Sequence, residues 1–226
     1  MNIIVTGSSR GLGLSLVQEL LNRKKHLIFG ISRSSAPQLL GSFNNYIHIQ
    51  ADLILSEGLF KIYEEISTKV VTVDAIINNA GLLINKPFKE TSITEIEQLM
   101  AVNFVSPSRL IQSLLPLLKP GSHIMNIGSM GGIQGSVKFP GLSFYSASKG
   151  ALTILTEVLA EEFKPLGIHV NCLAPGSVQT EMLAHAFPGY QASFTPRQLA
   201  VFLADFAERN YQFFNGKTLQ LAITTP

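Results

Sequence analysis

The sequence predicts an α/β fold, a doubly wound parallel sheet of about seven strands with helices on both faces. Two observations favour this fold. Short runs of apolar and β-branched residues alternate with longer helical stretches from one end of the chain to the other. The strand-like runs are also almost wholly apolar, as strands that are covered on both faces must be.

The first element is a β-branched strand at 3–5, which ends in a Gly-rich turn and leads into an amphipathic helix at 12–22. Later apolar runs of strand length predict strands at 26–31, 46–50, 73–77, 123–127, 168–173 and 218–222. Longer periodic stretches predict helices at 57–70, 93–118, 144–163 and 196–207.

Two helical stretches carry further signals. In 93–118, two helices are expected to meet near Asn103 to Pro107, and Pro165 and Gly167 close the helix at 144–163. The least regular segments are 32–45, 130–143 and 180–195. Loops at the carboxyl ends of parallel strands line the ligand crevice of such a sheet, so these segments are expected near the site.

Length and composition limit the possible functions. The 226 residues suit a single domain over 1–226, with a substrate site formed by loops around 129–145 and 176–196. A hydrophobic fraction of 46% with 14% charged residues excludes general disorder. The net charge of +2 is too small to indicate nucleic acid as a partner.

The remaining composition argues against metals and membranes. The one cysteine, Cys172, rules out a disulfide within the chain and argues against a Cys-based zinc site, and the five histidines show no ligand spacing. No metal is therefore expected. No targeting segment or membrane span is visible, so we expect a cytoplasmic protein that has no membrane partner.

The most specific motif is Thr6-Gly7-Ser8-Ser9-Arg10-Gly11-Leu12-Gly13, between the first strand and the first helix. Gly7 permits a tight turn, Gly11 lets the backbone approach a pyrophosphate, and Gly13 allows the helix to pack closely on the strand. The helix N-terminus offers free N–H groups and a positive dipole end to phosphates. This pattern predicts a dinucleotide site on a Rossmann-type fold.

A second motif, Tyr145-Ser146-Ala147-Ser148-Lys149, places a phenol and an ammonium on one face of a helix. A free tyrosine has a pKa of about 10 and is a poor acid–base group at neutral pH. A nearby cation lowers that pKa and makes the phenol useful for proton transfer. Alone the motif is weak, because a surface Tyr–Lys pair has the same spacing.

Together these motifs resemble the short-chain dehydrogenase/reductase superfamily, and the resemblance covers nearly the whole chain. Asn78-Asn79-Ala80-Gly81 follows the fourth strand, as Asn-Asn-Ala-Gly does in the family. Asn103 stands at the position of the family's helix asparagine, and Ser129 ends the fifth strand. The segment 175–180, Pro-Gly-Ser-Val-Gln-Thr, follows the sixth strand as the family's Pro-Gly-x-x-x-Thr does.

The resemblance implies four catalytic residues. Tyr145 would protonate the carbonyl oxygen, or act as the base in the reverse direction. Lys149 would lower the pKa of Tyr145 and hold the nicotinamide ribose, Ser129 would bind the substrate carbonyl, and Asn103 would hold a water in a proton relay. Ser129 as a strand-end cap and Asn103 as a helix cap or kink are the alternatives.

The resemblance also implies the cofactor contacts. Asn79 to Gly81 would line a ribose, and 175–180 would contact the nicotinamide end, with the backbone of Val178 near the carboxamide. Asp52 resembles the family's residue near the adenine, although it could simply cap the next helix. The expected cofactor-binding residues are Gly7, Ser9, Arg10, Gly11, Leu12, Gly13, Arg33, Asp52, Leu53, Asn79, Ala80, Gly81, Tyr145, Lys149, Pro175, Gly176, Val178 and Thr180.

The choice of cofactor follows from the end of the second strand. An NAD enzyme places an acidic residue there to hold the ribose diol, whereas this chain has Ile31-Ser32-Arg33. A guanidinium binds a 2′-phosphate well, and Arg10 can reach the same group. NADP(H) is therefore expected, with NAD(H) as the alternative.

The chain departs from the family pattern in three places. The stretch between Ser129 and Tyr145 is longer than usual, so Ser136 and Ser143 compete for the role of Ser129. The lid segment 180–195 is short, which favours an open site for a bulky or protein-borne substrate, with Phe187, Tyr190 and Phe194 either lining its mouth or packing on the domain. The chain ends at 219–226 without the usual Asp-Gly-Gly, which argues against a tetramer and leaves a homodimer through the helices at 104–118 and 145–163.

The predicted function is NADP(H)-dependent reduction of a small-molecule carbonyl, or oxidation of the matching alcohol. A 3-oxoacyl thioester is the nearest specific substrate, because 6–11 resembles the reductases of that subgroup. A non-catalytic protein that senses NADPH, or a structural subunit, is the alternative outside enzymes, since a fold by itself does not determine function.

Overall fold

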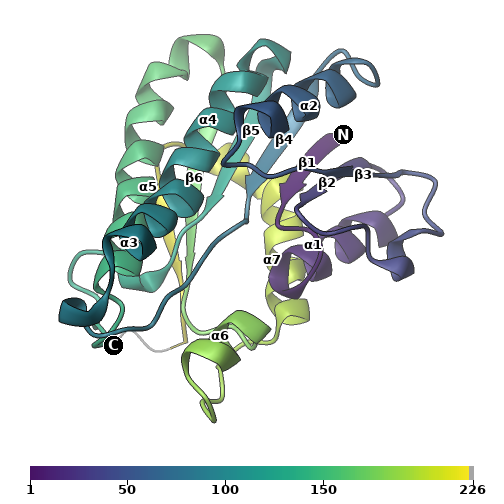
Figure 1. The fold of residues 1–226 in the computed structure, drawn as a ribbon. Coiled ribbons are helices and arrows are strands. Elements are labelled where there is room, and N and C mark those ends of the chain that lie inside the picture. The colour runs from purple at the N-terminus through teal and green to yellow at the C-terminus, as the bar shows by residue number, and fades with distance from the viewer. Residues whose placement is uncertain (224–226) are drawn as a thin grey trace.

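The computed structural model describes residues 1–223, and its centre is one sheet of seven strands (Figure 1). The strands are β1 (Asn2–Thr6), β2 (Leu27–Ser32), β3 (Tyr46–Gln50), β4 (Val73–Asn78), β5 (Leu118–Ile127), β6 (His169–Pro175) and β7 (Thr218–Leu221). The helices are α1 (Gly11–Asn22), α2 (Ser56–Ser67), α3 (Ile93–Met100), α4 (Ser106–Leu114), α5 (Ser143–Glu162), α6 (Glu181–Ala186) and α7 (Pro196–Glu208).

The strand order is β3-β2-β1-β4-β5-β6-β7, and every described pairing is parallel. The predicted doubly wound α/β fold is confirmed. The order reverses between β1 and β4, which pair directly with Ile4 opposite Ile76. In sheets of this kind the crevice outside the strand ends at this reversal point receives the ligand.

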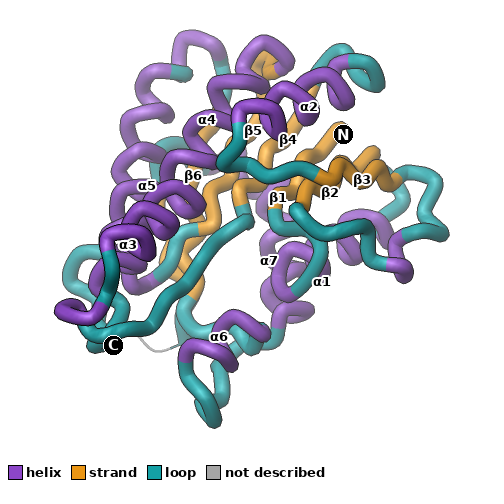
Figure 2. The backbone as a smooth tube through the Cα atoms, in the orientation of Figure 1, coloured by secondary structure: helices purple, strands orange, loops and turns teal. Residues whose placement is uncertain are grey.

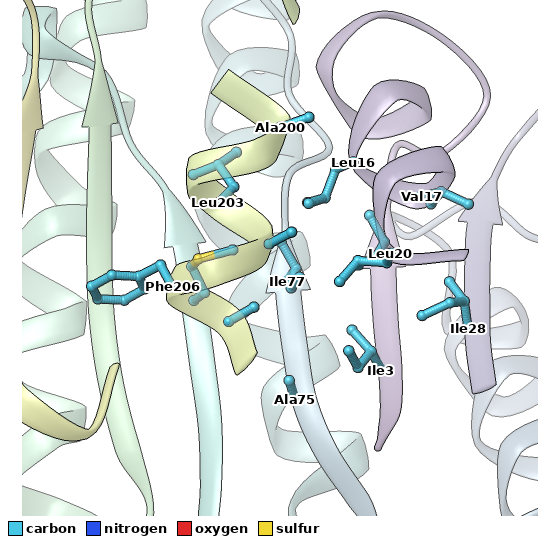
Figure 3. Close-up of a cluster of buried hydrophobic side chains, with 14 of the residues drawn as sticks. Ile3, Leu16, Val17, Leu20, Ile28, Ala75, Ile77, Ala200, Leu203 and Phe206 are labelled. Atoms are coloured by element: carbon cyan, nitrogen blue, oxygen red, sulfur yellow. The ribbon is translucent and has the colours of Figure 1, made fainter. Parts of the chain in front are cut away.

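Helices cover both faces of the sheet. On one face α1 and α7 lie side by side, and Leu20 and Leu203 pack with Ile3 and Ile77 of the strands (Figure 3). On the other face α2 and α4 pack against β1 to β4, and α5 covers β5 and β6. The strands are apolar on both sides because each face contributes to a core.

The stretch 93–118 contains the two helices that were predicted, α3 and α4, which meet near Asn103. Its helical path is continuous, since a π-helical turn at Ala101–Val105 joins α3 to α4. The helical path then ends in a 3₁₀ turn at Leu115–Leu117, and β5 begins at Leu118, earlier than expected, with an irregular register to β4. Pro107 explains the π turn, because proline has no N–H to donate to the carbonyl of Asn103 four residues earlier.

A second difference lies in the segment 180–195, which was expected to be irregular. It contains the short helix α6, and Thr180 caps that helix by accepting a hydrogen bond from the backbone N–H of Leu183 at 3.2 Å. The other predicted elements are found with ends that shift by a few residues. The closing residues 224–226, used above to argue against a tetramer, lie outside the described residues.

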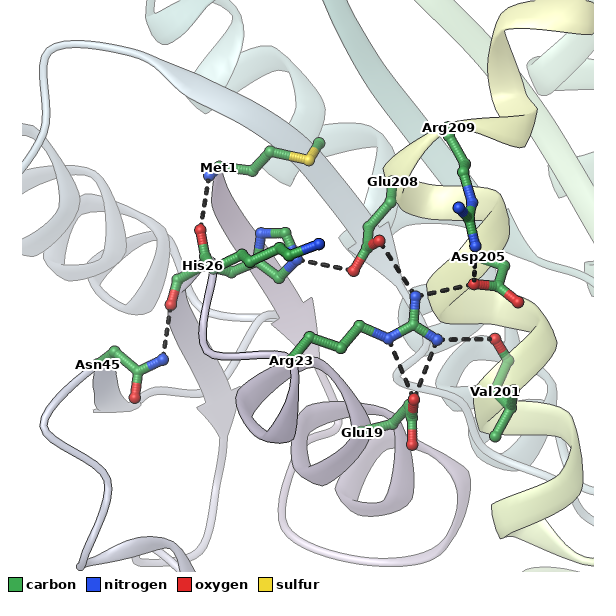
Figure 4. A network of polar contacts seen from close by, with 10 residues as sticks. Met1, Glu19, Arg23, His26, Asn45, Val201, Asp205, Glu208 and Arg209 are labelled. Carbon is green, nitrogen blue, oxygen red and sulfur yellow. Dashed lines mark hydrogen bonds and ion pairs between the residues drawn. The ribbon is translucent and has the colours of Figure 1, made fainter.

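Partly buried charged residues join α1 to α7 (Figure 4). The guanidinium of Arg23 contacts Glu19 at 3.0 Å, Asp205 at 2.9 Å and Glu208 at 3.1 Å, and the ring of His26 contacts Glu208 at 2.7 Å. Residues 1–223 contain no cluster of three metal-ligand side chains. Within the same residues, none of the helices combines the length and the apolarity that crossing a bilayer requires.

Candidate active site

The Gly-rich turn has the geometry that a bound dinucleotide needs. Figure 2 shows the loops gathered at the edge of the sheet near α6. Gly7 has a φ of +69°, a conformation that favours glycine. A Cβ on Gly13 would lie 2.2 Å from the carbonyl oxygen of Gly7, so only glycine lets α1 approach the turn this closely. The residues present therefore form a cradle of the kind predicted.

The turn is held in place from the neighbouring strand. The hydroxyl of Thr6 accepts hydrogen bonds from the backbone N–H groups of Asn79 and Ala80, each at 3.0 Å. In return, the side-chain amide of Asn79 donates to the carbonyl of Thr6 at 2.9 Å. These bonds tie the ends of β1 and β4 together at the point where the strand order reverses. Asn79 therefore braces the turn with the side chain that was expected to line a ribose.

The start of α1 leaves its N–H groups available. Arg10 is the N-cap residue, and its side chain makes no capping bond. It lies instead 3.6 Å from Glu181 at the start of α6, in an ion pair that is exposed on both sides. Thr180 lies against Gly11: a Cβ added to Gly11 would be 3.5 Å from the methyl carbon of Thr180. The segment after β6 therefore crosses directly over the Gly-rich turn.

Ser129 and Tyr145 meet beyond the end of β5. Ser129 follows that strand, and Tyr145 lies in the first turn of α5. Burial raises the pKa of the Tyr145 phenol above its ordinary value, and the nearby Ser129 hydroxyl partly offsets this rise. Of the competing serines, Ser136 is bound to the carbonyl of its own loop at Ile133, 3.0 Å away, and Ser143 begins α5 in an exposed position.

Lys149 is buried one turn further along α5. Its ammonium donates to the backbone carbonyl of Ile127 at 2.8 Å, and a Cβ on Gly81 would lie 3.6 Å from the same nitrogen. Burial lowers the pKa of Lys149 to about 8. Lys149 was expected to lower the pKa of Tyr145, but in the protein alone that pKa is raised, because desolvation dominates.

Asn103 is fully engaged in hydrogen bonds. Its amide nitrogen donates to the Leu82 carbonyl at 2.8 Å and to the Ser148 hydroxyl at 2.9 Å, and its amide oxygen accepts from the backbone N–H of Leu82 at 2.8 Å. The side chain therefore connects the loop after β4 to α5. The water that Asn103 was expected to hold in a proton relay stays a prediction.

The predicted 2′-phosphate residue lies at the opposite side of the crevice. Arg33 is exposed directly after β2, and its backbone carbonyl accepts from the side chain of Gln50 at 2.9 Å. Asp52 accepts from the backbone N–H of Ile54 at 3.0 Å, within the turn that precedes α2. The neighbouring Leu53 packs partly into the core under α2. Asp52 does not cap α2, which was the simpler alternative, because Leu55 is the N-cap residue of that helix and α2 has no side-chain cap.

The lid segment contacts the loops that face it. Asn85 donates to the carbonyl of Ala186 at 2.7 Å, and the rings of Phe139 and Phe187 lie 6.4 Å apart, edge to face. The site was expected to be open, but these contacts join the segment 180–195 to the loops that contain Asn85 and Phe139. Tyr190 packs beside Phe187, whereas Phe194 pairs with Val178 in a β-bridge and turns toward α7.

The sequence reasoning missed three groups of supporting residues. Thr6 belongs to the Gly-rich motif, but its hydroxyl was given no role. Ser148 connects Asn103 to the Tyr145 carbonyl, which it reaches at 2.7 Å, and its position inside the Tyr-x-x-Ser-Lys pattern could have indicated this. The side chains of β3 that bind the loop after β2 gave no sequence signal, because they contact residues distant along the chain.

Comparison with known proteins agrees with this geometry. A family model described as short chain dehydrogenase matches residues 1–191. The probable short-chain type dehydrogenase/reductase VdlC of Helicobacter pylori is 34% identical over 188 residues, which cover 81% of this chain and 67% of that protein. The 3-oxoacyl-acyl-carrier-protein reductase FabG of Aquifex aeolicus is 32% identical over 189 residues, covering 80% of this chain and 75% of that protein.

The fold is shared as well. A short chain dehydrogenase from Burkholderia cenocepacia, solved in complex with NADP, superposes with a TM-score of 0.87 at 26% identity and covers 97% of this chain and 95% of that one. The chain belongs to the short-chain dehydrogenase family, and the resemblance drawn from its motifs is confirmed.

Proposed function

We propose that this short-chain dehydrogenase reduces a small-molecule carbonyl with NADP(H), or oxidises the matching alcohol, with Tyr145 as the acid or base. The observation that carries the proposal is the placement of Ser129, Tyr145 and Lys149 around the end of β5, next to the Gly-rich turn. A protein that only sensed a nucleotide would have no use for a half-buried phenol facing a serine hydroxyl.

The chain's own groups would act as follows. A nicotinamide held there would supply the hydride for the carbonyl carbon. The Ser129 hydroxyl orients the carbonyl oxygen and stabilises the negative charge that develops there. Tyr145 donates its phenolic proton to that oxygen, and its raised pKa keeps the proton on the phenol until then. The Lys149 ammonium stabilises the resulting phenolate, and Asn103 holds α5 against the loop after β4.

Residues around the Gly-rich turn would hold the cofactor. The N–H groups at the start of α1 would bind the pyrophosphate, and the loop at 79–81 and the segment 175–180 would enclose the nicotinamide half. The exposed Arg33, with no acidic residue at the end of β2, supports NADP(H) over NAD(H). Arg10 would have to leave its exposed pair with Glu181 to reach the 2′-phosphate, and such pairs are weak.

The experiment is a fluorescence titration of the purified protein with NADPH and NADH, repeated with Arg33→Asp. Wild-type protein should bind NADPH more tightly, and Arg33→Asp should weaken NADPH binding about 10- to 100-fold while NADH binding is kept or improved. A wild-type preference for NADH would refute the cofactor assignment and leave the fold intact. Binding of neither nucleotide would refute the enzyme proposal.

A 3-oxoacyl thioester is the second candidate substrate. It is supported by the 32% identity to the reductase of Aquifex aeolicus. Steady-state oxidation of NADPH, compared between a 3-oxoacyl thioester and simple ketones and aldehydes, decides between the two. A kcat/KM at least 100-fold higher for the thioester would select it, and equal or lower values would reject it.

We also propose a homodimer that forms through the outer faces of the helical stretches at 104–118 and 145–163. Val105, Ile154 and Val158 are exposed on these helices, at 41%, 59% and 48%. Apolar side chains gathered on a surface favour association. Light scattering after gel filtration should give twice the mass of the chain, and Ile154→Glu should give the monomer mass. A wild-type monomer would refute this part of the proposal.

A further inference from the structure

Two side chains of β3, His48 and Gln50, contact the loop that follows β2, and Tyr46 contacts His48. Tyr46, His48 and Gln50 lie on one face of the strand, as residues two apart do. The Gln50 amide donates to the carbonyl of Arg33 at 2.9 Å, and the His48 ring nitrogen Nε2 lies 3.0 Å from the carbonyl of Ser34. The backbone carbonyls of Arg33 and Ser34 are therefore held from the neighbouring strand rather than by the loop alone.

The direction of these hydrogen bonds can be derived. The carbonyl of Ser34 can only accept, so Nε2 of His48 carries the proton. In the neutral ring, Nδ1 must then accept, and its partner at 3.2 Å is the hydroxyl of Tyr46, which donates to it. The phenol of Tyr46 thus selects the tautomer of His48 that can hold Ser34.

The Tyr46 end of this set of contacts lies under the Gly-rich turn. A Cβ on Gly30 would lie 2.4 Å from the Tyr46 oxygen and 2.9 Å from the Ser8 oxygen, so a glycine in β2 leaves the space in which the two hydroxyls approach each other. The Ser8 hydroxyl is fully buried and has no hydrogen-bond partner of good geometry within residues 1–223. Burial raises the pKa of Tyr46, and the Ser8 hydroxyl partly offsets that rise.

The two loops are also joined through the backbone. The carbonyl of Ile31 accepts from the N–H of Gly7 at 2.8 Å and from the N–H of Ser8 at 3.3 Å. One connected set of contacts therefore runs from the pyrophosphate turn, through Tyr46 and His48, to the loop that presents Arg33. The two loops that would touch the adenosine half of the cofactor are held in one arrangement before the cofactor arrives.

We propose that Tyr46 and His48 are positioning residues that preset the loop at 33–35 to receive the 2′-phosphate of NADP(H). This inference rests on the proposed preference for NADP(H). NADH lacks that phosphate and depends on the Gly-rich turn instead, so loosening the loop should weaken NADPH binding and leave NADH binding nearly unchanged. Preorganisation raises affinity because the ordering cost of the loop is already met in the free protein.

The test compares His48→Ala, His48→Gln and Tyr46→Phe with the wild type. Dissociation constants are measured for NADPH, NADH, and the fragments 2′,5′-ADP and 5′-AMP, which differ by the same phosphate. His48→Ala should weaken NADPH and 2′,5′-ADP binding about tenfold, the effect of about one lost hydrogen bond, with NADH and 5′-AMP changed less than about twofold. His48→Gln should recover most of the affinity, because its amide can both donate to Ser34 and accept from Tyr46.

Tyr46→Phe removes only the hydroxyl and guards against a folding defect in His48→Ala. It should weaken NADPH binding about threefold, since the tautomer of His48 is no longer selected. Tyr63→Phe is the matched control, because Tyr63 is a half-buried tyrosine on α2 that packs on the opposite face of the sheet. This variant should leave the affinities for NADPH and NADH unchanged.

The possible outcomes separate the two proposals. If the wild type prefers NADPH and the variants weaken NADPH and NADH equally, or weaken neither, the positioning role is wrong and the cofactor assignment stands. If the wild type prefers NADH, the cofactor assignment is wrong and the positioning role falls with it.

Discussion

The ammonium of Lys149 donates a hydrogen bond to the backbone carbonyl of Ile127 at 2.8 Å, which links α5 to the end of β5. The side chain is only 4% exposed. A single neutral acceptor does not replace the water that a buried ammonium loses, so burial lowers the pKa of Lys149 to about 8. The site therefore keeps a cation where the fold would be more stable without one.

Lys149→Met should abolish activity and stabilise the fold. A decrease of the pKa from 10.5 to about 8 means that the buried charge destabilises the folded state by about 3 kcal/mol at neutral pH. Methionine fills the same space but loses one hydrogen bond, so a net gain of about 1–2 kcal/mol is expected, or roughly 3–6 °C in Tm. Thermal unfolding at pH 7 measures the change in Tm, and a Tm below that of the wild type would contradict the claim that the buried ammonium destabilises the fold.

The same lysine predicts a pH dependence. Its pKa is lower in the folded than in the unfolded chain, so between about 8 and 10.5 the unfolded state binds more protons and wild-type stability rises with pH. The stability difference between Lys149→Met and wild type should therefore shrink as the pH is raised from 7 to 10. A constant difference across this range would show that the ammonium is not desolvated.

Tyr145→Phe should lower kcat by about a thousandfold or more and leave NADPH binding within about threefold of wild type. The phenyl ring keeps the packing, and only the transferable proton is lost. Turnover at fixed saturating NADPH gives the first value and a fluorescence titration gives the second. Normal turnover by this variant would mean that another group supplies the proton.

Gly13→Ala should disrupt the Gly-rich turn. The added Cβ would meet the Gly7 carbonyl oxygen at 2.2 Å and the Asn79 amide nitrogen at 2.4 Å, so α1 must move away from β1. A loss of about 2–4 kcal/mol in unfolding free energy and of NADPH binding is expected. Gly150→Ala on α5 is the control, since its Cβ would lie 3.4 Å from its nearest neighbour outside the helix, and helix propensity predicts a gain of up to about 1 kcal/mol. Equal effects of the two variants would refute the close approach at Gly13.

Arg23→Leu should destabilise the contact between α1 and α7. Its guanidinium is 18% exposed and serves three carboxylates, so its loss leaves them close together and partly buried, at a cost of about 1–3 kcal/mol. The exposed pair of Lys61 and Glu65 is the control, and Lys61→Ala should cost less than about 0.5 kcal/mol. Urea unfolding of both variants makes the comparison.

The ion pairs of Arg23 should also make the stability of the fold depend on pH in the acid range. The hydrogen bond from Arg23 holds the pKa of Asp205 below its ordinary 3.8. A carboxyl whose pKa is lowered by folding contributes stability above its ordinary pKa and loses that contribution as the pH falls through the folded value. The effect of Arg23→Leu should therefore diminish below about pH 4. An undiminished effect at pH 3 would assign the cost to lost packing instead.

Local signals made much of this protein predictable from its sequence. The apolar runs at 3–5 and 73–77 have the composition of buried parallel strands, and the structure places them side by side. The close packing expected at Gly13 is found, because a Cβ there would meet the Gly7 carbonyl oxygen at 2.2 Å, whereas the approach of Gly11 to a pyrophosphate stays a prediction. The two helices expected to meet near Asn103 do so, but no local signal indicated that a π turn would join them without a break.

The sequence by itself determined the fold class and the family, because these depend on residue type, period and spacing along the chain. Only the tertiary structure decided that Asn79 braces Thr6, that Asn103 joins Ser148 to Leu82, and that the phenol of Tyr145 is less acidic than a free tyrosine. It alone placed His48 against Ser34. These relationships join side chains far apart in sequence, and burial, which sets their charge and hydrogen bonding, exists only once the sheet and helices have packed.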